Sequence, residues 1–198
     1  MRSRKLMGLL AAGLLMTAVS PALASAASPA QKFLHNVVKS KTVVWVLTAN
    51  ATIANGGENY DGYFRGKMIV SVPLGWTVKV VFKNVGSIPH SVVVEPWNEN
   101  YNSPFPKPAF PRAESANAVD GTVPGSSQTF SFKATKVGKF RVICAVPGHA
   151  ALGMWDTLVV SKGLKQAVWG MPPKAKPKAK PKAKPKAHKK GSVARKHA

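Results

Sequence analysis

Cysteine is nearly absent from this sequence, because Cys144 is the single one among 198 residues. An intrachain disulfide is therefore excluded. Exported chains usually pair their cysteines or contain none, so one unpaired cysteine needs a reason. Three interpretations are open at this point: a buried inert thiol, one half of an intermolecular disulfide, or a metal ligand.

Acidic residues are also scarce, with 7 Asp and Glu against 29 Lys and Arg. The basic excess is unevenly placed: three basic residues lie in the first five positions and eleven lie from Lys174 onward. All seven acids and fifteen basic residues lie between residues 29 and 171, so this core has a net charge near +8 and the tail one of +11. The N-terminal sequence, described next, indicates that the chain is exported. We therefore expect anionic cell-wall polymers or membrane surfaces as targets of the tail, and we do not expect nucleic acid.

A hydrophobic run long enough to cross a membrane comfortably is missing as well. The sequence LMGLLAAGLLMTAV (residues 6–19) follows a basic start and precedes ALASA (residues 22–26), which is typical of a secretory signal peptide. We therefore expect residues 1–26 to be a signal peptide, with an uncleaved membrane anchor as the alternative. Either interpretation places the folded part outside the cytoplasm, in the periplasm, the cell envelope or the extracellular space.

The C-terminal region lacks nearly everything that a core requires. The sequence KAKPKAKPKAKPKA (residues 174–187) has a proline at every fourth position, which forbids a helix, and its lysines repel each other. We expect residues 172–198 to be a disordered, extended basic tail. It either tethers the protein to an anionic surface or serves as a solubilising tail without a fixed partner.

A helical hydrophobic stripe is absent between residues 41 and 165, where the apolar residues follow the period of β-strands. In TVKVVFK, for example, Val78, Val80 and Phe82 share one face. Segments rich in Val, Ile, Thr and aromatic residues, separated by Gly- and Pro-containing turns, predict strands within residues 41–51, 67–75, 76–84, 89–96, 126–135, 138–146 and 154–161. We therefore expect one all-β domain, an antiparallel sandwich of about seven to eight strands.

Two segments depart from this pattern. Residues 27–40 form an N-terminal segment, and AQKFLHNVVKSK (residues 30–41) is the one place in the core where a short helix is expected. Residues 97–121 contain four prolines and no alternation, which predicts a long loop. Its aromatic residues Tyr101, Phe105 and Phe110 are expected to pack over another part of the domain.

The surroundings of Cys144 favour a metal. Cys144 ends a predicted strand, and His149 and Met154 follow before the next strand, in the spacing C-x4-H-x4-M. A thiolate, an imidazole and a thioether together select copper, in a site of one Cys, two His and a weak axial Met. His90 is the only other histidine in the strand-rich part, because His35 lies in the N-terminal segment and His188 and His197 lie in the tail.

Other interpretations of this set are weaker. Zinc is disfavoured because Met is a poor zinc ligand and only three strong ligands are present. A cysteine nucleophile with a histidine base lacks an accompanying third residue or oxyanion-hole pattern. A chance cluster, with Met154 as an ordinary core residue, is the remaining alternative.

Two stretches, CAVPGHAALGMW (residues 144–155) and PLGWTVKVVFKNVGSIPHSVVV (residues 73–94), closely resemble the sulfocyanins, which are small blue copper proteins of the cupredoxin fold. The ligand spacing is similar to that of rusticyanin and auracyanin and differs from the shorter loops of plastocyanin and azurin. The resemblance runs from about Lys41 to Ser161. It implies a Greek-key cupredoxin domain, with His90, Cys144 and His149 as equatorial copper ligands and Met154 as the axial ligand.

The resemblance also implies a function, the transfer of single electrons by one copper ion without conversion of a substrate. The expected partners are redox proteins such as cytochromes or a terminal oxidase, and we expect a monomer. Alternatives are a copper-dependent oxidoreductase component, a copper-binding or storage protein of the cell envelope, and an adhesive β-sandwich acting through its tail. A copper enzyme needs more histidines than the core offers, and a binuclear copper centre needs a second cysteine.

Two neighbours of the expected ligands have predicted roles. The hydroxyl of Ser91 is placed to bond a loop backbone group near Cys144, although a strand serine facing solvent is equally compatible with the sequence. His149 lies among uncharged residues, from Pro147 to Leu152, and is expected to provide the route by which electrons leave.

Overall fold

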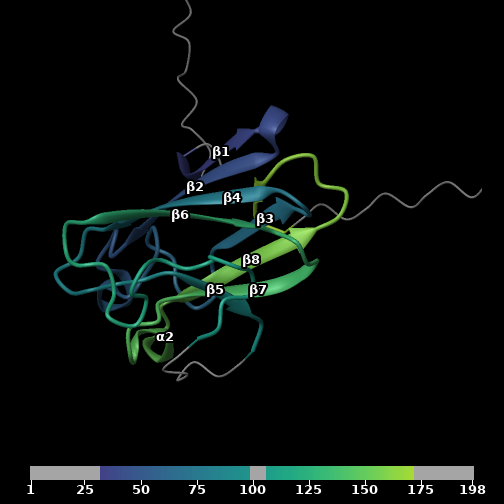
Figure 1. The fold of residues 1–198 in the computed structure, drawn as a ribbon. Helices are drawn as coiled ribbons and strands as arrows, with labels where there is room; N and C mark the ends of the chain where they lie inside the picture. Colours follow the sequence, from purple (N-terminus) through teal and green to yellow (C-terminus); the bar gives the residue numbers. More distant parts are fainter. Residues whose placement is uncertain (1–31, 99–105, 172–198) are drawn as a thin grey trace, which may run out of the picture.

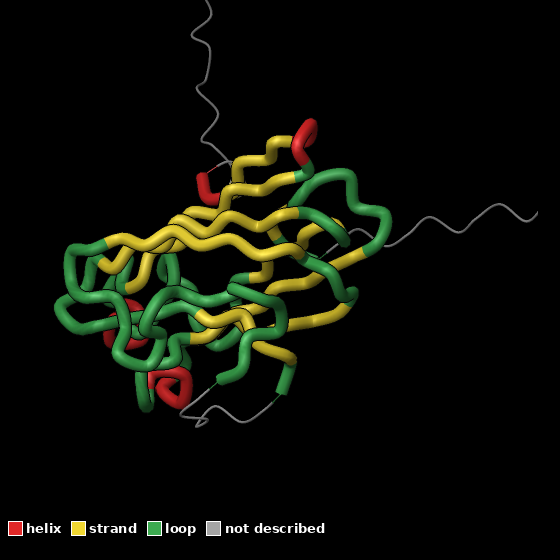
Figure 2. Tube along the Cα trace, in the orientation of Figure 1, coloured by secondary structure: helices red, strands yellow, loops and turns green. Residues whose placement is uncertain are grey.

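Two β-sheets face each other in the computed structural model, which describes residues 32–98 and 106–171 (Figures 1 and 2). The first sheet has the order β1-β2-β4-β6 and comprises β1 (Leu34–Val37), β2 (Thr42–Ala49), β4 (Thr77–Asn84) and β6 (Ser127–Lys133). The second has the order β5-β7-β8-β3-β9 and comprises β5 (Val93–Pro96), β7 (Gly138–Ile143), β8 (Trp155–Ser161), β3 (Ile69–Pro73) and β9 (Val168–Trp169). The described helical segments are short: η1 (Val38–Ser40), η2 (Ala54–Gly57), α2 (His149–Leu152) and the two helical residues Lys32 and Phe33. The predicted all-β sandwich is confirmed, and the seven predicted strands are all present.

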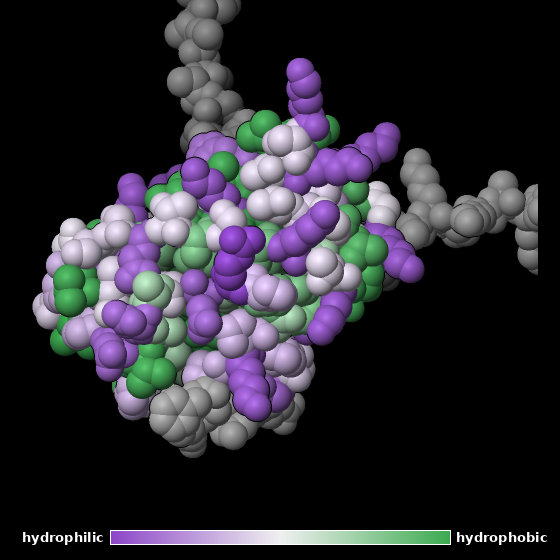
Figure 3. All heavy atoms as spheres, viewed as in Figure 1, coloured by the Kyte–Doolittle hydropathy of each residue, from purple (hydrophilic) through white to green (hydrophobic). Residues whose placement is uncertain are grey.

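The alternation in the sequence determines which side chains fill the space between the sheets. Val78, Val80 and Phe82 of β4 are fully buried, whereas Lys79 and Lys83 on the opposite face are exposed. The same alternation runs along β2, so both central strands of the first sheet present apolar side chains to the second sheet. Full burial of a side chain of this size contributes about 1.5–3 kcal/mol relative to exposure. Figure 3 shows hydrophilic side chains projecting from the outer surface of the domain.

Strand direction differs from the antiparallel prediction in two places. β2 pairs with β4 in parallel, from Thr42 opposite Thr77 to Ala49 opposite Asn84, and β3 pairs with β8 in parallel. The remaining strand pairs of the described residues are antiparallel. The reason is topological, because β3 lies between β2 and β4 in the chain and belongs to the other sheet. A crossover connection of this kind allows parallel pairing, and side-chain alternation carries no information about direction.

In the described part of residues 30–41, the predicted helix is present only at Lys32 and Phe33 and does not continue beyond them. Residues 34–37 form the edge strand β1, which pairs with β2 and places Leu34 opposite Trp45. Leu34 is buried there, so a tertiary contact overrides the weak local pattern. Asn36 also exchanges two hydrogen bonds with Ala167, of 3.0 and 2.8 Å, which fasten β1 to the segment before β9.

The loop predicted at residues 97–121 covers the core with its described part. Phe110 is buried, and its ring lies 5.3 Å from the ring of Phe132 and 4.7 Å from that of Phe140. The prediction that this loop packs over the domain is confirmed for Phe110, while Tyr101 and Phe105 lie outside the described residues.

The connections that carry the predicted ligands lie at one end of the sandwich. β2 and β4 run in parallel and therefore end together, and β6 begins beside them. The β4–β5 and β7–β8 connections carry the predicted ligands.

Within the described ranges, no helix is long and apolar enough to cross a membrane. The predicted signal peptide lies outside these ranges, and so does the basic tail.

Candidate metal centre

Cys144 is the first residue after β7 and continues its line. Its N–H donates to the carbonyl of Met154 across 3.1 Å, so the backbone ladder between β7 and β8 extends to the base of the connecting loop. The side chain is 1% exposed and forms part of the hydrophobic core cluster. The cysteine is therefore held by the rigid end of a sheet.

His149 begins α2, which occupies the loop between Cys144 and Met154. Gly148 and Gly153 flank this single turn, with φ values of 87° and 111° that a side chain would disfavour. A Cβ atom at Gly153 would also lie 2.7 Å from the side chain of Arg65. The N–H of Met154 donates to the carbonyl of His149 across 3.0 Å, which closes the turn and fixes the histidine above the end of the strand.

His90 reaches the same place from the β4–β5 connection. It pairs with Thr122 through two backbone hydrogen bonds of 3.2 and 2.7 Å. The amide of Asn84 donates to the carbonyls of Ile88 and Thr122, at 2.8 Å each, and fixes this connection against the loop before β6. The imidazole of His90 is fully buried.

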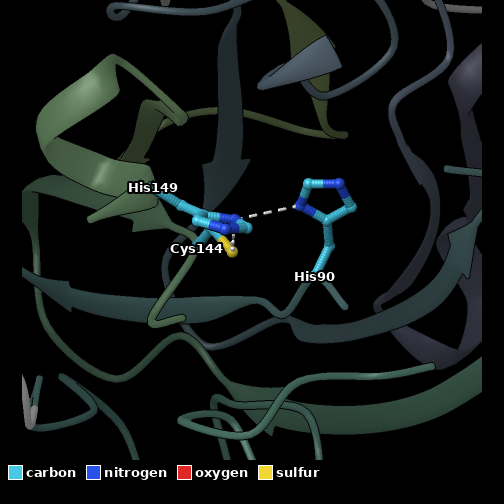
Figure 4. Close-up of side chains that lie close together, drawn as sticks. All are labelled: His90, Cys144 and His149. Atoms are coloured by element: carbon cyan, nitrogen blue, oxygen red, sulfur yellow. Dashed lines mark hydrogen bonds between the residues drawn. The ribbon is translucent and has the colours of Figure 1, made fainter. Parts of the chain in front are cut away.

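The three side chains converge on one point (Figure 4). The Nδ1 atoms of His90 and His149 are 3.2 Å apart, and Nδ1 of His149 is 3.4 Å from Sγ of Cys144. Their ligand atoms all lie within 4.8 Å of one another. Bonds of about 2.0–2.3 Å from nitrogen and sulfur to one metal ion need donor atoms separated by about 3–4 Å. The separations fit one ion, and the set of two imidazoles and one thiolate fits copper.

Burial controls the protonation of these groups. It lowers the pKa of His149, and burial together with the neighbouring His149 lowers the pKa of His90 to about 4. Both imidazoles are therefore neutral and able to ligate near neutral pH. Burial raises the pKa of the Cys144 thiol to about 11, so metal binding must displace the proton of this thiol.

Ser91 supports the sulfur as the sequence predicted. Its hydroxyl accepts a hydrogen bond of 2.9 Å from the N–H of Ala145, directly after Cys144. The N–H of Ser91 donates to Sγ of Cys144 across 3.3 Å, and the hydroxyl oxygen lies 3.7 Å from that sulfur. The alternative of a solvent-facing serine is wrong, since Ser91 is fully buried. Tyr60 adds a further anchor by donating its hydroxyl to the Ser91 carbonyl.

Met154 is fully buried in the core cluster. Its backbone bonds to both Cys144 and His149, so its position in the chain is fixed against two of the converging residues. Trp155 follows at the start of β8 and is partly buried. His35 lies on the edge strand β1 with its side chain exposed, and it does not belong to the cluster of converging ligands.

Sequence reasoning missed one charged group at the site, Glu58. Its Oε2 lies 3.1 Å from Nδ1 of His149 and 3.9 Å from Nδ1 of His90. Glu58 is 8% exposed, and burial raises the pKa of its carboxyl. It lies 32 residues before His90 in a Gly-rich turn after η2, where no local pattern indicates a ligand.

Comparisons with known proteins identify the family of the chain. The family model described as "Sulfocyanin (SoxE) domain" matches residues 29–168, which is more than half of the chain. Sulfocyanin from Sulfolobus acidocaldarius is 27% identical over 138 residues, which cover 63% of this chain and 66% of the relative. That match therefore spans slightly less than two thirds of the relative's length.

Solved structures similar to this one include rusticyanin and auracyanin. A rusticyanin structure is 24% identical and covers 61% of this chain and 78% of its own, with a TM-score of 0.49. Reduced auracyanin from Roseiflexus castenholzii is 26% identical and covers 62% of this chain and 98% of its own, with a TM-score of 0.44. On the family match and on the buried histidine and cysteine donors positioned to bind one copper ion, this chain belongs to the sulfocyanin family of blue copper proteins.

Proposed function

We propose that the protein is a mononuclear type 1 copper electron carrier that exchanges one electron at a time with redox partners outside the cytoplasm. The observation that carries this proposal is the convergence of His90, Cys144 and His149 from two separate connections, with all three buried. When bound, copper supplies the one-electron chemistry by cycling between Cu(II) and Cu(I).

Met154 is proposed as the weak axial ligand of this site. Its residue type is the one that completes a His2Cys copper site, and its main chain is bonded to Cys144 and to His149. Complete burial keeps water away from its side chain. The residue therefore combines a suitable donor with a fixed position beside two of the ligands.

The scaffold limits rearrangement of the ligands between oxidation states. The extended β7–β8 ladder holds Cys144, two glycines bracket the turn of His149, and Asn84 ties the His90 connection to Thr122. A donor set that changes little between the two states allows rapid transfer of an electron in either direction. The folded chain therefore contributes orientation, exclusion of water and hydrogen bonds to the sulfur.

Electrons are proposed to leave and enter through His149. This residue is 9% exposed, the largest value among the three converging ligands, and its exposed neighbours Pro147, Gly148, Ala151 and Leu152 carry no charge. Leu152 alone is 58% exposed. A small uncharged surface around a ligand permits the brief contacts that electron-transfer partners make. Cytochromes or a terminal oxidase are the proposed partners.

The proposed location is outside the cytoplasm, close to an anionic surface. Residues 1–26 have the pattern of a signal peptide, and eleven basic residues follow Lys174. Lysines near an acidic lipid surface each contribute about 1 kcal/mol of attraction. We propose that the tail holds the carrier near the membrane or the cell wall.

Titration of the metal-free protein with Cu(II) tests the proposed function. We expect an intense charge-transfer colour from thiolate to copper, together with a type 1 EPR spectrum. Cys144→Ser must abolish the colour, and Ser71→Ala, a change at a buried serine of β3, must leave it unchanged. Far-UV circular dichroism checks that each variant is folded. A wild-type protein that stays colourless with one equivalent of Cu(II) would falsify the proposal.

A further inference from the structure

The segment that carries Glu58 is held tightly against the copper-binding end of the molecule. The side-chain amide of Asn59 donates to the carbonyls of Thr52 and Ala54, at 2.8 Å each. The amide of Asn55 donates to the carbonyl of Glu58 across 2.8 Å and to the carbonyl of Leu152, in α2, across 3.1 Å. Glu58 and His149 are therefore fixed relative to one another by bonds that do not involve either side chain.

The carboxylate of Glu58 has few partners. Its Oε2 is buried and forms no hydrogen bond within residues 32–98 and 106–171. The only ion-pair contacts of Glu58 among those residues are with the Nδ1 atoms of His149 and His90, and no lysine or arginine pairs with it. Burying a carboxylate without a cationic partner costs roughly several kcal/mol of free energy, unless a metal or a proton neutralises the charge.

The position of this oxygen is informative. Oε2 lies beside the Nδ1 atoms of His149 and His90, which are the atoms that face one another at the site. When these nitrogens bind a metal they carry no proton, so they cannot donate a hydrogen bond to the carboxylate. The cluster of donor atoms that lie within 4.8 Å of one another comprises His90, Cys144 and His149 and does not include Glu58. The carboxylate therefore lies beside the proposed ligands, where the positive charge of a bound ion would neutralise it.

We propose that the carboxylate of Glu58 supplies a negative charge beside the metal held by His90, Cys144 and His149, and that this charge favours the oxidised ion. This inference rests on the proposed function. With Cu(II), one thiolate and one carboxylate the buried site is neutral, whereas reduction leaves it with a net negative charge. Burial penalises that charge, so Glu58 lowers the reduction potential.

The test compares Glu58→Gln with Glu114→Gln, a matched change at an exposed acid. Both are loaded with copper and measured at one fixed neutral pH. For Glu58→Gln we expect at least a tenfold shift of the equilibrium toward Cu(I), a rise in potential of about 59 mV or more for a one-electron couple. Its copper hyperfine splitting in EPR must change as well. Glu114→Gln must match the wild type in both measurements.

A second measurement needs no variant. The wild-type protein, labelled with carbon-13 at the carboxyl carbons of its four glutamates, is loaded with Co(II) or, as the diamagnetic reference, Zn(II). We expect paramagnetic Co(II) to shift or broaden one of the four carboxyl signals far more than the other three, because the carboxylate of Glu58 lies beside the proposed ligands. Four signals that Co(II) affects equally little, or a Glu58→Gln variant with unchanged EPR and potential, overturn the proposal.

The failures of the two proposals are distinguishable. A wild-type protein without colour in the presence of Cu(II) contradicts the electron-carrier proposal. A blue wild-type protein that is insensitive to Glu58→Gln leaves the carrier in place and contradicts only the role of Glu58.

Discussion

The backbone N–H of Ser91 points at the sulfur of Cys144, with 3.3 Å between the nitrogen and Sγ. The hydroxyl of the same serine accepts the N–H of Ala145, the residue after the cysteine. Ser91 follows His90 in the chain, so one dipeptide supplies one proposed ligand of the metal and the groups that orient another. Hydrogen bonds to the sulfur are among the factors that set the potential of such a site.

Ser91→Ala is expected to lower both the stability and the reduction potential while the colour remains. The buried N–H of Ala145 loses its acceptor, which costs about 1–3 kcal/mol. The sulfur loses a hydroxyl 3.7 Å away that can donate to it, so the thiolate becomes a stronger electron donor and Cu(II) is favoured. Thermal unfolding and voltammetry measure the two effects.

Ser71→Ala is the matched control for Ser91. Ser71 is fully buried in β3, and its hydroxyl donates to the carbonyl of Gly170 across 2.6 Å. It belongs to the second sheet and contacts none of the proposed ligands in the hydrogen-bond pattern of the described residues. Its replacement is expected to reduce stability alone. Equal potentials for the wild type and Ser91→Ala would show that the serine is only structural.

Changes at Met154 test the proposed axial ligand. Met154→Leu conserves volume, with a stability cost below about 1.5 kcal/mol, and removes the thioether. The loss of a donor destabilises Cu(II), so the potential is expected to rise. Met154→Gln supplies an oxygen donor in place of sulfur, and is expected to keep the colour and lower the potential.

Met68→Leu is the control, since Met68 is also fully buried and precedes β3. It is expected to leave the potential unchanged. If Met154→Leu and Met68→Leu give the same potential, Met154 is an ordinary core residue.

The elements that the sequence predicted well are those with a local signature. Strict alternation identified β2 and β4, and the proposed ligands Cys144 and His149, which the structure brings together with His90, lie within one short loop. His90 was identified by elimination among few histidines. The role of Ser91 followed from its place directly after His90.

The features that were missed depend on contacts between distant segments. β1 is a strand because Leu34 meets the buried Trp45 of β2, a contact that its own sequence does not encode. The parallel pairing of β2 with β4 arises because the chain crosses to the other sheet between them. Glu58 reaches His149 only through the folded turn that joins Asn55 to Leu152.

Asp61 is expected to make the metal-free fold more stable in mild acid than at neutral pH. Burial raises the pKa of this carboxyl from 3.8 to about 7, and its Oδ1 accepts the N–H of Thr48 across 3.1 Å. Between these two pKa values the folded protein binds more protons than the unfolded protein. The free energy of unfolding contributed by Asp61 therefore falls as the pH rises from about 4 to about 7.

The buried histidines act in the opposite direction. The pKa of His90 is lowered to about 4, so the metal-free fold loses stability as the pH falls from about 6.5 toward that value. A melting curve of the wild type alone therefore mixes the two effects. The difference between the wild type and a variant at Asp61 cancels the contribution of the histidines. It retains the contribution of Asp61, together with the effect of Asp61 on the pKa of Asp156.

Asp61→Asn is the variant that isolates the carboxyl. Asn tolerates the left-handed backbone at this position, where φ is 52°, and its amide oxygen can still accept the Thr48 N–H. We expect its melting temperature to exceed that of the wild type at pH 7 and the two to approach each other near pH 4. Asp120→Asn, at an exposed acid, must follow the wild type throughout. A constant difference across the pH range would contradict the assignment.

Deletion of residues 174–198 tests the proposed tether. The deletion removes eleven basic residues and is expected to leave the colour and the potential unchanged, because the ligands all lie in the folded domain. Each lysine near an acidic lipid surface contributes about 1 kcal/mol, so engagement of even two of them predicts a more than tenfold loss of retention on anionic vesicles.

Cosedimentation with anionic and with neutral vesicles, at low and at high salt, measures this retention. Neutral vesicles are expected to retain neither form, and salt is expected to release the full-length protein from anionic ones. Unchanged retention after the deletion, or binding that salt does not weaken, would leave the tail as a solubilising segment without a fixed partner.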